Sequence, residues 1–312
     1  MRMSDTPTPD NPGLLNWFLI IFLGVIWGAA FMAIATALEG YGPRLFTASR
    51  LAGAAILLNI LGAFIGQPIT AIHKTAGKRG WLFISLIGTI ALAIPLSMLS
   101  WGQQHVPSAF AGVAMSTVPI LVLPLVYIFS PEEGIGPRRV IGMIIGFVGL
   151  IVLVGPGAFS SSESDLVLWG RIACIVCACG YAVGSVLTRR APKMPPIAFA
   201  AGTMTIAAAI TVPFALLTEP LPNTLPFTPT SALIYAALLP TAIGAIIRVR
   251  VITTAGSLFM NITSYMVPIW SVIFGITLMG EDLPAQLFTA LALVLLGIFV
   301  SQSRAILAAL RR

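Results

Sequence analysis

The feature that most constrains this chain is a succession of ten apolar runs, each long enough to cross a membrane as a helix. An α-helix rises about 1.5 Å per residue, so roughly 20 residues span the ~30 Å hydrocarbon core of a bilayer. The alternating ~10-residue segments typical of a membrane β-barrel are not seen. We therefore expect an all-α polytopic membrane protein with ten transmembrane helices, at residues 15–38, 45–66, 81–100, 107–129, 140–157, 166–188, 195–217, 232–253, 257–279 and 284–303.

The composition excludes a soluble globular protein. Hydrophobic residues make up 58% of the 312 residues and charged residues only 9%, whereas an average soluble protein has about 25% charged residues. A water-exposed surface cannot be built from so few charges. The only charges inside the ten runs lie near run ends, where a long side chain can reach the headgroups; they are Arg50, Arg171, Arg248 and Arg250.

The positions of the basic residues predict the orientation. The net charge of +7 would suggest nucleic-acid binding in a soluble chain. Here, with the N-terminus inside, all but three of the 17 basic residues fall on the cytoplasmic side, the exceptions being Arg44, Arg50 and Arg171. Cytoplasmic loops of membrane proteins carry such an excess. We therefore expect both termini in the cytoplasm, and a lipid bilayer rather than nucleic acid as the partner.

An internal repeat predicts two halves. Ser108 and Pro119 recur 149 positions later as Ser257 and Pro268, and an acidic pair follows each proline at the same spacing. Each half holds five runs, and an odd number forces the second copy into the membrane upside down. This is a transporter architecture in which two inverted halves enclose a site near the midplane.

The predicted organisation has four parts. A cytoplasmic tail at 1–14 lacks the basic start of a signal peptide, so the first run is expected to be a permanent span. The first five-helix repeat covers 15–157 and the inverted second repeat covers 166–303. A cytoplasmic tail at 304–312 completes the chain.

Several short motifs resemble one transporter family. They are Trp27-Gly-Ala-Ala-Phe31, the early Arg50, the repeated Ser-x10-Pro-x12-Glu pattern and the glycines at 142, 146 and 149. Together they resemble the drug/metabolite transporter superfamily in its ten-helix EamA branch, with the bacterial exporters of aromatic and other neutral amino acids as the nearest group. The resemblance implies a 5+5 inverted-repeat bundle that exports small metabolites. It also implies a central cavity lined by the first, third, fourth, sixth, eighth and ninth helices.

The ninth run carries the largest group of candidate substrate-binding residues. In a continuous helix Asn261, Ser264, Tyr265 and Pro268 share one face. An amide, a hydroxyl, a phenol and the carbonyl that Pro268 frees would suit an ammonium or carboxylate group. The alternative is that these polar groups only join neighbouring helices.

The repeat-related prolines are candidate conformational hinges. Pro119 and Pro268 each remove one helical hydrogen bond and free the carbonyl four residues earlier. We expect them to bend the helices around the cavity. The alternative is a kink that neighbouring groups satisfy.

Further candidates lie in the first and third runs. Ser97 and Trp101 share a face with Gln104 near the outer end of the third run. Trp101 either lines the cavity or anchors the helix at the membrane interface. Trp27 lies in the middle of its run, far from either interface, so it either packs between helices or lines the cavity.

The sixth and eighth runs complete the candidates. Tyr181 and Ser185 occupy one face of the sixth run, and the segment resembles a second-half counterpart of the Trp27 motif. Arg248 and Arg250 are explained by the cytoplasmic excess of positive charge. The alternative is that they meet an anionic group of the substrate.

The residue types inside the ten runs argue against catalysis. No Asp, Glu, His or Lys lies inside any of the ten runs, so neither a general base nor a metal-ligand set is available at a defined depth. Cys174, Cys177 and Cys179 have no nearby His and are expected to pack as small residues. We expect no enzyme activity, no metal and no cofactor.

The sequence therefore predicts an inner-membrane exporter of small neutral metabolites, with amino acids, including aromatic ones, as the favoured substrates. It would work by alternating access. Because the spans offer no titratable group that could couple transport to protons, facilitated transport is expected. The alternatives are a passive channel, a structural membrane subunit, or an exporter of other metabolites or drugs; the oligomeric state is left open.

Overall fold

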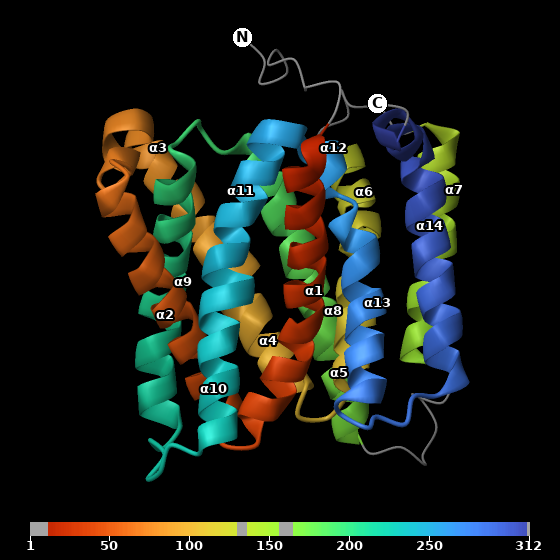
Figure 1. The fold of residues 1–312 in the computed structure, drawn as a ribbon, viewed down its shortest axis with the longest axis horizontal. Helices are drawn as coiled ribbons and strands as arrows, with labels where there is room; N and C mark the ends of the chain where they lie inside the picture. The colour runs from red at the N-terminus through yellow and green to blue at the C-terminus, as the bar shows by residue number, and fades with distance from the viewer. Residues whose placement is uncertain (1–11, 130–135, 156–164, 311–312) are drawn as a thin grey trace.

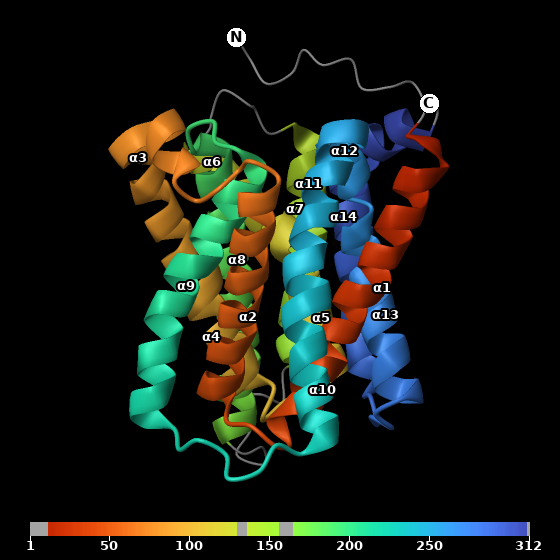
Figure 2. The same cartoon turned by 60° about the vertical axis from the view of Figure 1, so that its left-hand side comes forward.

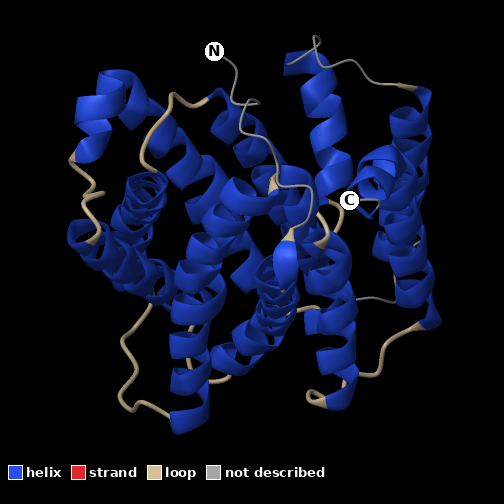
Figure 3. Ribbon diagram, turned by 45° about the horizontal axis from the view of Figure 1, so that its top comes forward, coloured by secondary structure: helices blue, strands red, loops and turns tan. Residues whose placement is uncertain are grey.

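The computed structural model describes residues 12–129, 136–155 and 165–310. Every regular element within those residues is a helix, and no strand occurs among them (Figure 3). This confirms the predicted all-α class. The first five predicted spans correspond to α1 (Gly13–Leu38), α2 (Pro43–Phe64), α3 (Ala71–Ile87) with η1 (Gly88–Ala93) and α4 (Ile94–Gly102), α5 (Ser108–Met115) with α6 (Val118–Phe129), and α7 (Pro137–Val154).

The last five predicted spans are also helical in the described residues. They correspond to α8 (Asp165–Arg190), α9 (Pro196–Thr218), α10 (Phe227–Ala236) with η4 (Ala237–Ile243) and α11 (Gly244–Ala255), α12 (Ser257–Met260) with α13 (Thr263–Thr277), and α14 (Ala285–Leu310). Nine of these spans are long and apolar enough to cross a membrane, and α13 adds a shorter apolar helix. The chain is thus a polytopic membrane protein.

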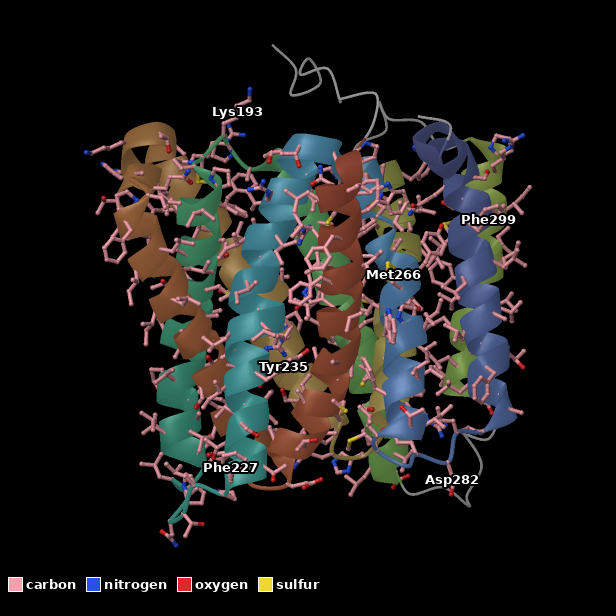
Figure 4. The ribbon with its side chains drawn as sticks, in the orientation of Figure 1. Lys193, Phe227, Tyr235, Met266, Asp282 and Phe299 are labelled. Carbon is pink, nitrogen blue, oxygen red and sulfur yellow. The ribbon has the colours of Figure 1, made fainter. Side chains whose placement is uncertain are left out.

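The bundle has two ends that differ in the residues they carry. α1 begins and α14 finishes at the same end, shown at the top of Figure 1. Lys193 lies at this end, whereas Phe227 and Asp282 lie at the opposite one (Figure 4). The assignment of the Lys193 end to the cytoplasm stays a prediction.

The third span starts earlier than predicted. The sequence predicted a loop before residue 81, but α3 already begins at Ala71. Ile72 is fully buried against Ile84 and Ala198, while basic residues on the other side of the helix remain in solvent. This amphipathic turn extends the helix out of the apolar run, and Gly77 bends it with a φ of 56°.

The third and eighth spans each contain a π-helical segment. η1 begins at Gly88 and η4 begins at Ala237, 149 positions later. This is the spacing of the repeat in the sequence. The two π-helical segments therefore lie at equivalent positions of the two halves. π-helical turns widen a helix and often mark functional sites.

The helices of the two halves pack in pairs across the molecule. α7 packs along α14 at one edge of the bundle (Figure 1), because Gly142 and Gly149 leave no room for a Cβ against that helix. At another edge α2 runs beside α9 (Figure 2).

α2 and α9 also cap one another. Gln67, just after α2, accepts a hydrogen bond from the backbone N–H of Ile197 at the start of α9 (3.1 Å). Glu219, just after α9, accepts one from the N–H of Leu45 in the first turn of α2 (2.8 Å). Each helix start therefore has at least one free N–H group bonded by the chain that leaves its neighbour.

Candidate functional site

Three hydrogen bonds tie α1 to the eighth span. The Trp27 indole N–H donates to the carbonyl of Pro240 (2.9 Å). The Tyr235 hydroxyl donates to the carbonyl of Ile26 (3.1 Å), and the Thr254 hydroxyl donates to Asn16 Oδ1 (2.9 Å). These contacts lie between Asn16 and Trp27, so the first half of α1 is joined to the α10–η4–α11 helix.

Pro240 creates the polar chemistry of η4. A proline lacks an N–H, so the α-helical bond from residue 240 to the carbonyl of Ala236, four residues back, cannot form. The Thr241 hydroxyl donates to that carbonyl (2.7 Å). Arg50 Nε from α2 in turn donates to Thr241 Oγ1 (2.8 Å). A buried arginine of the second span thus stabilises the π-helix of the eighth.

Arg50 and Arg248 both lie within electrostatic range of Tyr181 on α8. Arg50 is 7% exposed, while Arg248 is exposed and Tyr181 is half-buried. No acidic side chain is among the groups that act on either arginine in the described part of the chain. We call these three residues the Arg–Tyr–Arg cluster.

The sixth-span candidates lie against the third span. Tyr181 and Ser185 are both half-buried on α8. The glycines beside them, Gly180 and Gly184, leave no room for a Cβ against the η1–α4 segment. Tyr181 therefore lies where α8 meets the π-helical span of the first half, while Trp27 contacts the π-helical span of the second half.

The third-span candidates make local contacts. The Ser97 hydroxyl donates to the carbonyl of Ala93 in its own helix (2.7 Å). The ring of Trp101 packs edge-on against His105, with centroids 4.9 Å apart, and both residues are half-buried. Gln104 is exposed.

The ninth span is not the continuous helix that the shared face required. α12 ends at Met260, and Asn261 lies in a turn before α13. The backbone there tightens to hydrogen bonds three residues apart, from the N–H of Ser264 to the carbonyl of Asn261 (3.0 Å). The expectation of one helical face is therefore wrong at its first residue, Asn261, which is exposed.

Tyr265 on α13 packs among apolar side chains. It lies beside Ile120 of α6 and Val294 and Ile298 of α14, and its hydroxyl is buried without a hydrogen-bond partner among the described residues. Ser264 is half-buried. The role of these ninth-span residues in substrate binding stays a prediction.

The two hinge candidates differ in their settings. Pro119 is the second residue of α6, directly after a turn at Ser116 and Thr117 whose hydroxyls donate to the carbonyls of Val113 and Ala114. Pro268 is buried inside α13. Only Pro119 lies at a break in its helix, so the two prolines are not structural equivalents.

Sequence reasoning missed two polar residues. Thr241 was not among the sequence candidates, although it is a polar residue within an apolar run. Gln103 is buried, with its Nε2 donating to the carbonyl of Phe31 (2.9 Å) and its Oε1 unpaired. Arg50 was noticed as a motif, but its contact with Thr241 needed the fold.

No group of three potential metal ligands occurs among the residues that the structure describes. Cys174 and Cys177 are fully buried in the core of the bundle and Cys179 is exposed, all as free thiols.

Known proteins resemble this chain over nearly its full length. The inner membrane transporter YedA of Escherichia coli K12 is 28% identical over 292 residues, covering 91% of this chain and 90% of its own. A probable terminal-alkyne amino-acid exporter of Streptantibioticus cattleyicolor is 25% identical, covering 92% of this chain and 93% of its own. A solved crystal structure shares the fold, with a TM-score of 0.67 at 20% identity over 94% of this chain and 99% of the other.

The EamA-like transporter family matches twice, at residues 15–155 and 168–302. With the described spans and the Escherichia coli relative, this makes the chain a multi-pass protein of the inner membrane. The predicted resemblance is confirmed: the chain is a membrane transporter that belongs to the EamA-like transporter family.

Proposed function

We propose that the protein exports small neutral metabolites, with amino acids, including aromatic ones, as substrates. Transport proceeds by alternating access between two inverted five-helix halves, 15–157 and 166–303, and runs down the substrate gradient. The observation that carries this proposal is the Arg50–Thr241 contact, which puts polar groups from both halves in the interior of an otherwise apolar bundle.

The chemistry of the described spans supports a carrier for a zwitterion. Arg50, Tyr181 and Trp27 offer charged, hydroxyl and aromatic groups on helices of both halves. The relative from Streptantibioticus cattleyicolor, named as a probable amino-acid exporter, supports the same substrate class. The ten acidic residues of the sequence all lie outside the ten predicted spans, which supports transport without proton coupling.

The test is a screen of radiolabelled amino acids in proteoliposomes that contain the purified full-length protein. We expect saturable uptake of at least one neutral amino acid, inhibited by an excess of the unlabelled compound, and none in protein-free liposomes. Flux that rises linearly with concentration would indicate a passive channel. No flux of any amino acid would contradict the proposed substrate class, and a parallel panel of other metabolites and cationic drugs would then identify the cargo.

A further inference from the structure

The Arg–Tyr–Arg cluster has positive charge that the described part of the chain does not balance. Taking a charged group out of water costs several kcal/mol unless a partner compensates it. Arg50 is buried, and among the described residues the side chains that interact with it electrostatically are Tyr181 and Cys177, neither of which is a carboxylate. For Arg248 the interacting side chain in the described part of the chain is Tyr181.

The cluster also has unused hydrogen-bonding capacity. Arg50 donates only through Nε, and its two terminal nitrogens make no hydrogen bond within the described residues. They are not among the buried atoms without a partner, so they reach solvent. The Tyr181 hydroxyl likewise has no partner and reaches solvent, and Arg248 is exposed.

Arg50 is held against the same helix that carries Arg248. Thr241, which accepts the hydrogen bond from Arg50, and Arg248 are seven residues apart on the η4–α11 helix, a rise of about 10 Å. Tyr181 comes from α8, which is not packed closely on α11, and it lies within electrostatic range of both arginines.

From this arrangement we propose that the Arg–Tyr–Arg cluster binds a carboxylate of the transported molecule. Guanidinium groups match a carboxylate with parallel N–H donors, and the phenol adds another donor. The site thus takes molecules that carry a free carboxylate, which include the zwitterionic amino acids, and excludes the corresponding amides and amines. The inference rests on the proposed function in that it treats the interior of the bundle as the transport path.

The test compares matched acids and amides by thermal unfolding of the full-length protein in detergent. The pairs are 3-phenylpropionate and its amide, 4-methylpentanoate and its amide, and L-phenylalanine and its amide. A ligand that binds only the folded state raises the unfolding temperature. We expect at least one acid to do so, and its amide to bind at least about tenfold more weakly, because the amide cannot form a charge-assisted bond.

Two variants on one helix provide the matched comparison. Arg248→Gln should abolish the preference for the acid, while Arg248→Lys should keep part of it. Arg250→Gln removes an exposed arginine two residues away and should leave the preference unchanged. Equal stabilisation by acid and amide, stabilisation by no acid, or an acid preference that survives Arg248→Gln would overturn the inference. The comparison within the unmodified protein stands even if a variant fails to fold.

The outcome is separable from that of the proposed function. If 3-phenylpropionate binds but no amino acid is transported, the carboxylate site stands and amino-acid export fails. If an amino acid is transported and its amide competes equally well for uptake, export stands and the carboxylate site fails.

Discussion

Arg50 Nε donates a hydrogen bond to Thr241 Oγ1 at 2.8 Å, which joins the second span to the π-helix of the eighth. The same hydroxyl donates to the carbonyl of Ala236 (2.7 Å). A single threonine hydroxyl therefore contacts both the buried Arg50 and a backbone carbonyl of its own helix. Loss of this hydroxyl leaves Arg50 Nε without its hydrogen-bond partner.

Thr241→Val should lower the free energy of unfolding by about 1–3 kcal/mol, the cost of leaving buried polar groups unpaired. The measurement is thermal or denaturant unfolding of the purified protein in detergent. Thr211→Val is the control, because the buried Thr211 hydroxyl bonds only to a carbonyl of its own helix. Equal destabilisation by the two changes would show that the link to Arg50 adds nothing.

Trp27→Phe keeps an aromatic ring but removes the donor to the Pro240 carbonyl. A neutral hydrogen bond contributes about 0.5–1.5 kcal/mol, so we expect the transport rate to fall roughly two- to tenfold at normal expression. Trp17→Phe is the control, since Trp17 packs edge-on with Phe259 and makes no hydrogen bond among the described contacts. Unchanged transport in Trp27→Phe would leave Trp27 as a packing residue.

The spans could be predicted from the sequence because hydrophobic length alone determines what crosses a bilayer. The deviations within spans could not. The π-helical turn at Ala237 contacts Arg50 through Thr241, and these two residues are 191 positions apart in the chain. The start of α3 at Ala71 was missed because an amphipathic turn is not a hydrophobic run.

The sequence predicted several residues of the candidate site but not how they are arranged in space. Tyr181 and Arg248 were both singled out, but their proximity depends on how α8 and α11 cross in the bundle. The ninth-span face failed at Asn261 because the 3.6-residue period holds only for a continuous helix. Tightened hydrogen bonds at that position give no signal in the pattern of residue types.

The predicted orientation can be tested with single cysteines in a Cys179→Ser background, which removes the exposed native thiol. Lys193→Cys and Asn223→Cys lie at opposite ends of the bundle, in the segments after α8 and α9. In intact cells an impermeant thiol reagent should label Asn223→Cys, and should label Lys193→Cys only after permeabilisation. The reverse pattern would invert the topology and contradict the excess of cytoplasmic positive charge.

Tyr265→Phe separates a structural role from a substrate contact. The Tyr265 hydroxyl is buried without a partner, so its removal should leave the unfolding temperature unchanged or slightly higher. If the hydroxyl meets the substrate during transport, as the sequence predicts, uptake should still fall. Ile262→Ala, next to the exposed Asn261, is the control for general disturbance of the break. A clear loss of stability in Tyr265→Phe would mean that the hydroxyl joins helices.

The central claim, a facilitative carrier, is tested most directly by counterflow in proteoliposomes. Vesicles loaded with an unlabelled neutral amino acid are diluted into a trace of the labelled compound, with and without an imposed pH gradient. The account predicts transient accumulation of label above its equilibrium level, at rates that a moderate change of pH or an ionophore leaves unchanged. Absence of counterflow would contradict a carrier, and accumulation that requires the pH gradient would show a proton-coupling group.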